Sequence, residues 1–332
     1  MALWQVAAGS LGRDYSDRFL RHGLAFVGGD AFCAAMEQVK PGDILILKRG
    51  VSLIIAVGVV VERDGRCRSI GDKGWLRDFD GWDLQAWCNV DWHKPDTPYV
   101  TTGLTRATLQ GVYQQHLIDL ASRALAEVPK RTVYEPEPPP TESVTDEDMI
   151  GQLIEFGLRP AAAEELAQAL RRIRLLARFY LSRDWNLTKE HEARSFLVLP
   201  LLLALGWAEQ KIQIELAVPG VGRADIACFR KPVRSFGQDD DCAVIIETKN
   251  LGQGLDYAQD QAHRYAEKFP SCEVVLVTNG YCYKAFRRRL ADGGFPTHPT
   301  AYLNIMDPRD RYPLDPANVA GAIEVLRLLT PK

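Results

Sequence analysis

The sequence predicts an α+β chain with two domains, a small β-barrel followed by a mixed α/β domain. Short apolar runs separated by turn-forming residues fill residues 1 to about 112, a pattern typical of small barrels. Residues 134–143 are rich in proline and glutamate and lack a basic residue, which is typical of an extended linker. Beyond them, stretches with helical periodicity surround two strand-like runs. A chain of 332 residues is long enough for two cores.

The composition is that of a globular protein, with 46% hydrophobic and 25% charged residues. Because no apolar run approaches the length of a membrane span and the N-terminus lacks a leader pattern, we expect a cytoplasmic protein without a membrane partner. The seven cysteines are scattered without a Cys-X-X-Cys pair, so neither a zinc ribbon nor a disulfide framework is indicated. A net charge of -3 excludes a uniformly basic nucleic-acid binder, although Arg171–Arg178 and Arg287–Arg289 are local basic clusters.

The predicted elements follow from apolar periodicity and turn signals. In the first domain we expect strands at Trp4–Ala8, Ala25–Gly28, Ile44–Lys48 and Ser52–Val61, an extended Val90–Trp92, and helices at Tyr15–Gly23 and Leu104–Val128. In the second we expect helices near 146–157, Ala161–Tyr180 and 317–329, the first capped by Ser143 or Thr145. The apolar stripe of Ala161–Tyr180 packs on the second domain's sheet or forms a dimer face. The expected divisions are a first domain 1–130, a linker 131–145 and a second domain 146–332.

The order of motifs in the first domain resembles the PUA-like superfamily, near its EVE modules. The motifs are Trp4, Gly42-Asp43 before an apolar strand, Ala56-Val-Gly58 and Val90-Asp-Trp92. In that group the barrel binds nucleic acid and receives a flipped, modified base in an aromatic pocket. The resemblance makes these aromatic side chains candidates for that pocket: Trp4, Tyr15, Phe26, Trp75, Trp82 and Trp92.

Among these aromatic residues, Trp75 and Trp82 are favoured for the pocket because they lie in a polar loop punctuated by glycine. Trp92, in an extended segment, is favoured as a core residue. Polar candidates for reading base edges are Ser10, Asp14 and Asp43, the last equally well explained as a turn residue after Pro41-Gly42.

The central feature of the second domain is a pair of apolar runs, 223–229 and 243–249, joined by a loop of turn formers, which predicts a β-hairpin. Because side chains alternate along a strand, Glu247 and Lys249 point to one face. Asp225, on the partner strand, can share a divalent cation with Glu247, since Mg²⁺ prefers oxygen ligands. The alternative is a structural ion pair between Lys249 and Glu247, with Asp225 solvated.

The acid followed by Glu247-Thr248-Lys249 resembles the PD-(D/E)XK nuclease superfamily, with further similarity to the N-terminal nuclease region of type I restriction R subunits. The supporting motifs are Glu190-His-Glu-Ala-Arg194 before an apolar helix, Gly222 before Asp225, the pair Gln261 and Tyr265, and Val277-Thr-Asn-Gly280. The resemblance covers roughly residues 186 to 290 and implies a restriction-endonuclease-like fold.

The same resemblance assigns a role to each matching residue. Asp225 and Glu247, with the carbonyl of Thr248, would bind Mg²⁺ or Mn²⁺. Lys249 would assist the attacking water, and Glu190 would complete the metal shell, although Glu192 is an alternative. Gln261 and Tyr265 would position the active-site strand or the DNA backbone.

Together the two resemblances predict a modification-dependent endonuclease that binds modified double-stranded DNA, similar to restriction factors used against foreign DNA. No Walker loop is present, so no nucleotide cofactor is expected. Because one active centre cuts one strand, double-strand cleavage calls for a homodimer or two nicks. Two alternatives remain open, a DNA-binding module without catalysis and a nuclease directed to RNA.

Overall fold

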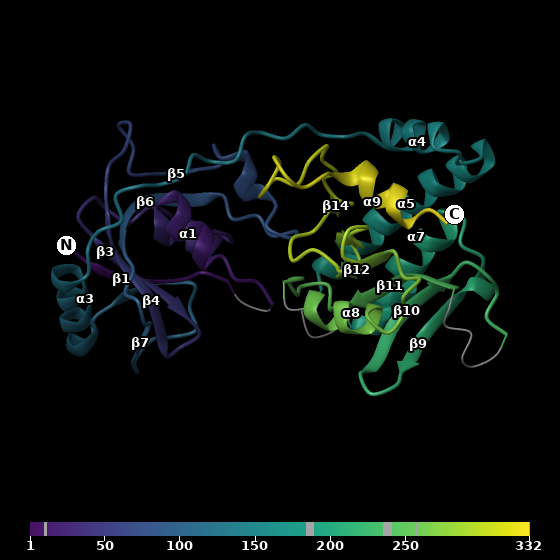
Figure 1. Cartoon of the computed structure of the whole chain (residues 1–332). Helices are drawn as coiled ribbons and strands as arrows, with labels where there is room; N and C mark the ends of the chain where they lie inside the picture. Colours follow the sequence, from purple (N-terminus) through teal and green to yellow (C-terminus); the bar gives the residue numbers. More distant parts are fainter. Residues whose placement is uncertain (10–11, 184–188, 235–240, 257, 332) are drawn as a thin grey trace. The chain divides into compact units, whose positions relative to one another are not determined.

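The computed structural model describes residues 1–9, 12–183, 189–234, 241–256 and 258–331. The chain forms two compact units, Met1–Pro139 and Pro140–Lys332, each with its own sheet and helices (Figure 1). The boundary falls inside the stretch 131–145 that composition marks as a linker. Within the described residues, no helix combines the length and the apolarity needed to cross a bilayer.

The first unit is organised on a curled, half-barrel sheet in which the strand order is β2-β6-β4-β3-β1-β8, with β5 added beside β6 and β7 beside β4 (Figure 1). β1 and β3 pair in parallel, and the other pairings are antiparallel. The strands are β1 Leu3–Ala7, β2 Leu24–Val27, β3 Ile44–Arg49, β4 Leu53–Val60, β5 Arg68–Ile70, β6 Ala86–His93, β7 Tyr99–Val100 and β8 Leu109–Val112.

The helical segments of this unit are α1 Ser16–His22, α2 Asp30–Met36, the 3-10 turn η1 Gly74–Arg77 and α3 Gln115–Glu127. α1 ends at Gly23, whose φ of 63° is the left-handed conformation that glycine adopts without strain. α3 buries Leu117 and Ala121 against the sheet residues Ile44 and Ile46. This contact closes one end of the core.

The predicted helix over Leu104–Val128 is wrong at its beginning. Residues Leu109–Val112 form strand β8, and the helix starts only at Gln115. Leu109 and Val112 are both buried, a spacing that fits one face of a helix. This segment is a strand because it pairs with β1, with Val112 opposite Leu3.

The second unit has a sheet with strand order β14-β13-β12-β11-β10-β9 (Figure 1). β11 and β12 are parallel, whereas the other neighbours are antiparallel. Its strands are β9 Ile212–Val218, β10 Gly222–Phe229, β11 Cys242–Thr248, β12 Val274–Thr278, β13 Cys282–Arg287 and β14 Ala301–Asn304. Its helical segments are α4 Asp146–Glu155, α5 Pro160–Leu181, α6 Glu190–Ala193, η2 Arg194–Val198, α7 Leu199–Ala204, η3 Glu209–Lys211, α8 Gln259–Ala266 and α9 Ala322–Leu329.

The predicted hairpin is confirmed, because β10 and β11 pair antiparallel with Ile226 opposite Ile246. The Thr145 cap is also confirmed: its hydroxyl accepts a hydrogen bond from the backbone N–H of Asp148 at 3.1 Å, and the Asp148 carboxylate accepts one in return. α5 buries Leu166, Leu170 and Ile173 within its own unit. Those positions are therefore part of the core and are not available as a dimer face.

Candidate functional site

Charged side chains gather in the second unit where β10 and β11 leave their pairing. Since Ile226 lies opposite Ile246, Asp225 and Glu247 occupy the same level of neighbouring strands. Lys249 follows two residues later, and Glu190 opens α6. Burial is the main cause that raises the pKa of Glu247, and Asp225 and Glu190 add to the rise by charge repulsion. Four of the residues expected at the site are thus brought together.

Glu247 is the most deeply buried of these groups, with only 2% of its surface exposed. One carboxylate oxygen accepts a hydrogen bond from Lys249 Nζ at 2.5 Å, whereas Oε2 is buried without a hydrogen-bond partner among the described residues. Burial raises the pKa of Glu247 to about 7; the bond from Lys249 opposes this shift, and Asp225 and Glu190 add to it. The negative charge of this side chain is therefore incompletely balanced.

Asp225 is held from two sides. Its Oδ2 accepts hydrogen bonds from the backbone N–H of Thr248 at 2.7 Å and from the Thr248 hydroxyl at 2.8 Å. Its Oδ1 accepts one from Arg194 Nη1 at 3.0 Å. The expectation of a solvated Asp225 in the structural alternative is wrong, because the carboxylate is tied both to the end of β11 and to the helix that begins at α6.

Sequence analysis missed Arg194 as a functional residue. Its side chain is 12% exposed and joins Asp225 to Glu215, which in turn pairs with Arg223 at 3.2 Å. Glu215 has a φ of 54°, unusual for a residue other than glycine. The available signal was the position of Arg194 one helical turn after Glu190.

The structure distinguishes the two glutamates of α6. Glu190 is half-buried, and its pKa is raised by burial and by Asp225 and lowered by Lys249 and Arg194. Glu192 instead accepts a hydrogen bond from the backbone N–H of Lys189 at 2.8 Å and lies 3.8 Å from Arg183. Glu190 therefore faces the charged cluster, and Glu192 caps the helix.

Gln261 and Tyr265 are paired with each other on α8, where Gln261 Nε2 donates to the Tyr265 hydroxyl at 2.9 Å. A Cβ added at Gly222 would lie 3.0 Å from that hydroxyl, so the close approach of Tyr265 requires glycine there. In the described part of the chain neither residue has a hydrogen bond to Asp225 or Glu247. Their contacts support the start of β10 and leave the carboxylates to other partners.

The carboxylate oxygens of this cluster are the kind of ligand that a hard divalent cation prefers. Glu247 Oε2 is a buried acceptor without a donor, and the neighbouring carboxylates would be relieved by positive charge. Asp225 is already bonded through both oxygens, and across the described ranges no three His, Cys, Asp or Glu side chains are arranged to hold a metal ion. Glu247 and Asp225, with the carbonyl of Thr248, would hold Mg²⁺ only once Arg194 yields its place on Asp225.

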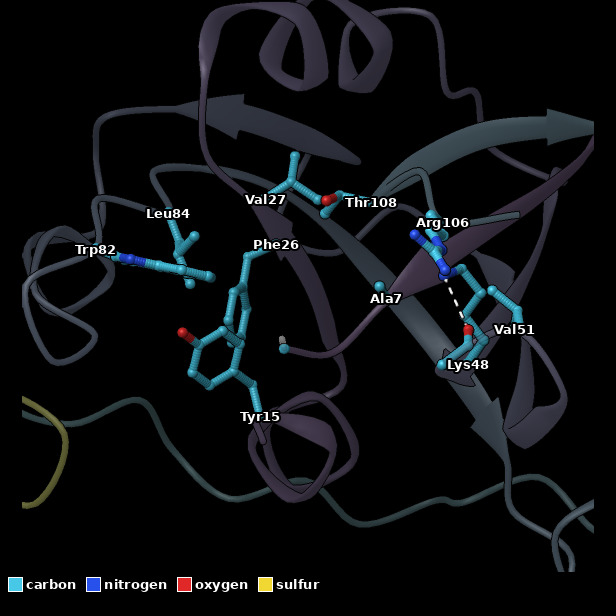
Figure 2. A pocket seen from close by; sticks show the side chains of 12 residues that line it. Ala7, Tyr15, Phe26, Val27, Lys48, Val51, Trp82, Leu84, Arg106 and Thr108 are labelled. Carbon is cyan, nitrogen blue, oxygen red and sulfur yellow. Dashed lines mark hydrogen bonds between the residues drawn. The ribbon is translucent and has the colours of Figure 1, made fainter. Parts of the chain in front are cut away.

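A second candidate site is a pocket of about 260 Å³ in the first unit (Figure 2). Tyr15, Phe26 and Trp82 gather at one end of it together with Leu84. The rings of Tyr15 and Trp82 stand edge to face with centroids 6.5 Å apart. The guanidinium of Arg13 lies 3.9 Å from the Trp82 ring centroid and fixes that indole. Of the six aromatic residues that the sequence proposes for a base pocket, these three line it.

The opposite end of the pocket is cationic, which sequence analysis did not anticipate. Lys48 and Arg106 line it beside Val51, away from the aromatic rings (Figure 2). Lys48 is 3% exposed, and its Nζ donates a hydrogen bond to the carbonyl of Gly50 at 3.2 Å. Burial lowers the pKa of Lys48. The available signal was a lysine at the end of the apolar strand Ile44–Lys48.

The other aromatic candidates lie outside this pocket. Trp75, favoured from its loop position, is buried against Phe26 and Phe79 and donates its indole N–H to Glu137 at 3.0 Å. Trp92 is fully buried and donates to the Leu24 carbonyl at 3.2 Å. The position of Trp75 in a polar loop did not predict its burial, because a short 3-10 turn directs the ring into the core.

Trp4 and the polar candidates also have structural partners. The indole N–H of Trp4 donates to Asp43 Oδ2 at 3.2 Å, and Asp43 Oδ1 accepts from the backbone N–H of Ala2 at 2.7 Å. Asp14 accepts a hydrogen bond from the backbone N–H of Ser16 at 3.0 Å, at the start of α1. Ser10 lies outside the described residues. Of the two readings of Asp43, these bonds favour the turn residue.

Comparisons with known proteins were negative. No protein-family model matches the chain, and no curated protein matches it.

Proposed function

We propose that the chain is a modification-dependent DNA endonuclease, in which the first unit binds a modified base and the second hydrolyses phosphodiester bonds with Mg²⁺. The observation that carries the nuclease half is Glu247, a buried carboxylate with one unpartnered oxygen beside Asp225, Glu190 and Lys249. The proposal agrees with the resemblance to PD-(D/E)XK nucleases and to PUA-like readers. Cleavage of both strands would then use two copies of the chain or two successive nicks.

A purely structural role explains Glu247 poorly. A buried polar atom without a partner costs about 1–3 kcal/mol, and two neighbouring carboxylates increase the repulsion. Replacing the pair with apolar residues would remove both costs. Such uncompensated charge is typical of sites that bind a charged ligand, so a divalent cation is the ligand that this cluster favours.

The side chains then have separate tasks. Mg²⁺, when bound, would supply positive charge to the phosphate and lower the pKa of a coordinated water. Glu247 and Asp225 would hold the ion, and Thr248 fixes the orientation of Asp225 through its two hydrogen bonds. Once the ion balances Glu247, the ammonium of Lys249 would donate to the attacking water or to the phosphate oxygen.

The reader half rests on the aromatic end of the pocket in the first unit. Flipping a base out of a duplex costs a few kcal/mol of stacking, which ring contacts in a pocket can replace. Tyr15, Phe26 and Trp82 supply those rings. A volume of about 260 Å³ is below the range of roughly 300–1,000 Å³ for drug-sized ligands, so the pocket suits a ligand no larger than a nucleotide.

The decisive experiment is a cleavage assay on plasmid DNA with modified or unmodified cytosine, titrated with Mg²⁺. We expect the wild type to cleave modified DNA, and Glu247→Gln and Lys249→Met to lose at least about 100-fold in rate, because each removes a charge needed in the transition state. Lys268→Met, an exposed lysine of the same unit, is the matched control. Equal cleavage by the wild type and both site variants would refute the assignment.

A DNA-binding module without catalysis is the second candidate. The observation in its favour is the bond from Arg194 to Asp225, which occupies one expected metal ligand. In this case the wild type would bind DNA but cleave neither substrate at any Mg²⁺ concentration. Matched RNA in the same assay tests the RNA-directed alternative.

A further inference from the structure

The cationic end of the pocket in the first unit offers hydrogen-bond donors that a neutral methylated base would not use. Lys48 is 3% exposed, and among the described residues its Nζ has one acceptor, the Gly50 carbonyl. An ammonium has three N–H donors, and leaving them without acceptors in a buried place is costly. The pocket therefore holds hydrogen-bond donors that the described residues around it leave unused.

The charge at this end also lacks an acidic counterpart. The described residues that line the pocket include Lys48 and Arg106 but neither Asp nor Glu. Burial alone accounts for the lowered pKa of Lys48, with no carboxylate acting to raise it. Arg106 is exposed at the same end and adds a second positive charge. The pocket is thus aromatic at one end and positively charged at the other.

We propose that this pocket binds an aromatic ring that carries an anionic group, a carboxylate or a phosphate. The ring lies against Tyr15, Phe26 and Trp82, and the anion accepts hydrogen bonds from Lys48 and, at the mouth, from Arg106. Two sources have this chemistry: a flipped pyrimidine with a carboxylate substituent in DNA, and a free mononucleotide. The first deepens the proposed reader function and depends on it, whereas the second does not.

A neutral ligand fits the same space less well. A methylated base would fill the aromatic end but leave the Lys48 ammonium without a new acceptor. A carboxylate or phosphate accepts charge-assisted hydrogen bonds, which are shorter and stronger than neutral ones. Selectivity for the anionic ligand therefore depends on Lys48, while the aromatic residues contribute equally to both ligands.

The test is equilibrium binding measured by calorimetry and by tryptophan fluorescence. The ligands are cytidine 5′-monophosphate against cytidine, and one duplex carrying either 5-carboxylcytosine or 5-methylcytosine. We expect at least one anionic ligand to bind 10-fold or more tightly than its neutral partner, with the difference lost in Lys48→Met. Lys40→Gln, which changes an exposed lysine of the same unit, should keep the difference.

The outcomes separate the sources. Preference for the carboxylated duplex identifies a base in DNA. A preference seen only between cytidine 5′-monophosphate and cytidine identifies a free nucleotide and refutes recognition of a carboxylated base in DNA. Equal binding of anionic and neutral ligands overturns the inference, as does a preference that survives in both Lys48→Met and Lys48→Gln. Because cleavage is not measured, a failed nuclease does not affect the result.

Discussion

The two units carry buried charges of opposite sign in a comparable state. In the first, Lys48 is a buried cation in a pocket where the described lining residues include no acid. In the second, Glu247 is a buried anion with a single lysine partner and two further carboxylates nearby. Burial moves both pKa values toward the neutral form, down for Lys48 and up for Glu247. The comparison teaches that each unit keeps a charge that its own fold does not fully balance.

The largest expected effect comes from removing the partner of Glu247. Lys249→Met leaves a buried carboxylate without its cation. Because Glu247 can take up a proton with a pKa of about 7, we expect the free energy of unfolding to fall by less than about 1 kcal/mol at pH 7 and by about 3 kcal/mol at pH 9. The double variant Lys249→Met with Glu247→Gln should recover most of that loss, because no charge remains to be balanced. Urea denaturation followed by circular dichroism measures both. If the single variant were as stable as the wild type at pH 9, Glu247 would not be an uncompensated anion.

The stability of the protein should also depend on pH through Glu247. The folded state holds the Glu247 proton up to a pKa of about 7, while the unfolded chain releases it near 4.5. The contribution of this group to stability is therefore complete below pH 4.5 and is lost as pH rises to about 7, a change on the order of 3 kcal/mol.

Urea denaturation at pH 5 and pH 8 gives the size of that change when the wild type is compared with Glu247→Gln. Saturating Mg²⁺ should reduce the difference in the wild type, because the cation favours the carboxylate at both pH values. The same slope in wild type and variant would assign the pH dependence to other groups, such as Glu190, whose pKa is also raised.

A smaller effect is expected at Arg194, which competes for Asp225. Arg194→Gln should raise the affinity of the protein for Mg²⁺ about 10-fold, since one ligand oxygen is released from an ion pair; this equals about 1.4 kcal/mol. Calorimetric titration of the metal measures it directly. Arg223→Gln, which contacts Glu215 but not Asp225, is the control and should leave the affinity unchanged. Weaker metal binding in Arg194→Gln would show that Arg194 orients Asp225 for the ion.

The smallest effect concerns the first unit. Lys48→Met replaces a buried ammonium with an apolar side chain of similar length, so we expect the ligand-free protein to gain about 1 kcal/mol in stability. This sign is opposite to that of Lys249→Met. A loss of stability, measured by urea denaturation, would show that Lys48 is satisfied within the fold.

The local parts of the fold could be predicted from the sequence. Two apolar runs joined by turn formers predicted the hairpin, and the pair Ser143 and Thr145 predicted the beginning of α4, because each signal comes from one continuous stretch of the chain. Strand β8 could not be predicted in this way. Leu109 and Val112 fit a helix equally well until β1, more than 100 residues earlier, pairs with them.

In the candidate sites, too, the local features could be predicted and those that depend on distant segments could not. The closeness of Asp225, Glu247 and Lys249 follows from strand register, which the sequence pattern contains. The bond from Arg194 to Asp225 and the place of Lys48 in an aromatic pocket depend on elements far apart along the chain. The ring of Trp75 points inward for the same reason, since Phe26 and Phe79 surround it only after folding.

The segment between the units is shorter than its composition suggests. Glu137 bonds to Trp75 and Thr141 to Arg309, each within its own unit, so the stretch between these anchors is Pro138 to Pro140. Consecutive prolines form a stiff, extended spacer with little slack. If the first unit binds the modified base and the second cleaves the DNA, as proposed above, a stiff spacer would restrict cleavage to a narrow range of distances from that base. A flexible glycine-serine insertion between Pro138 and Pro140 would widen this range of cleavage distances without changing either unit.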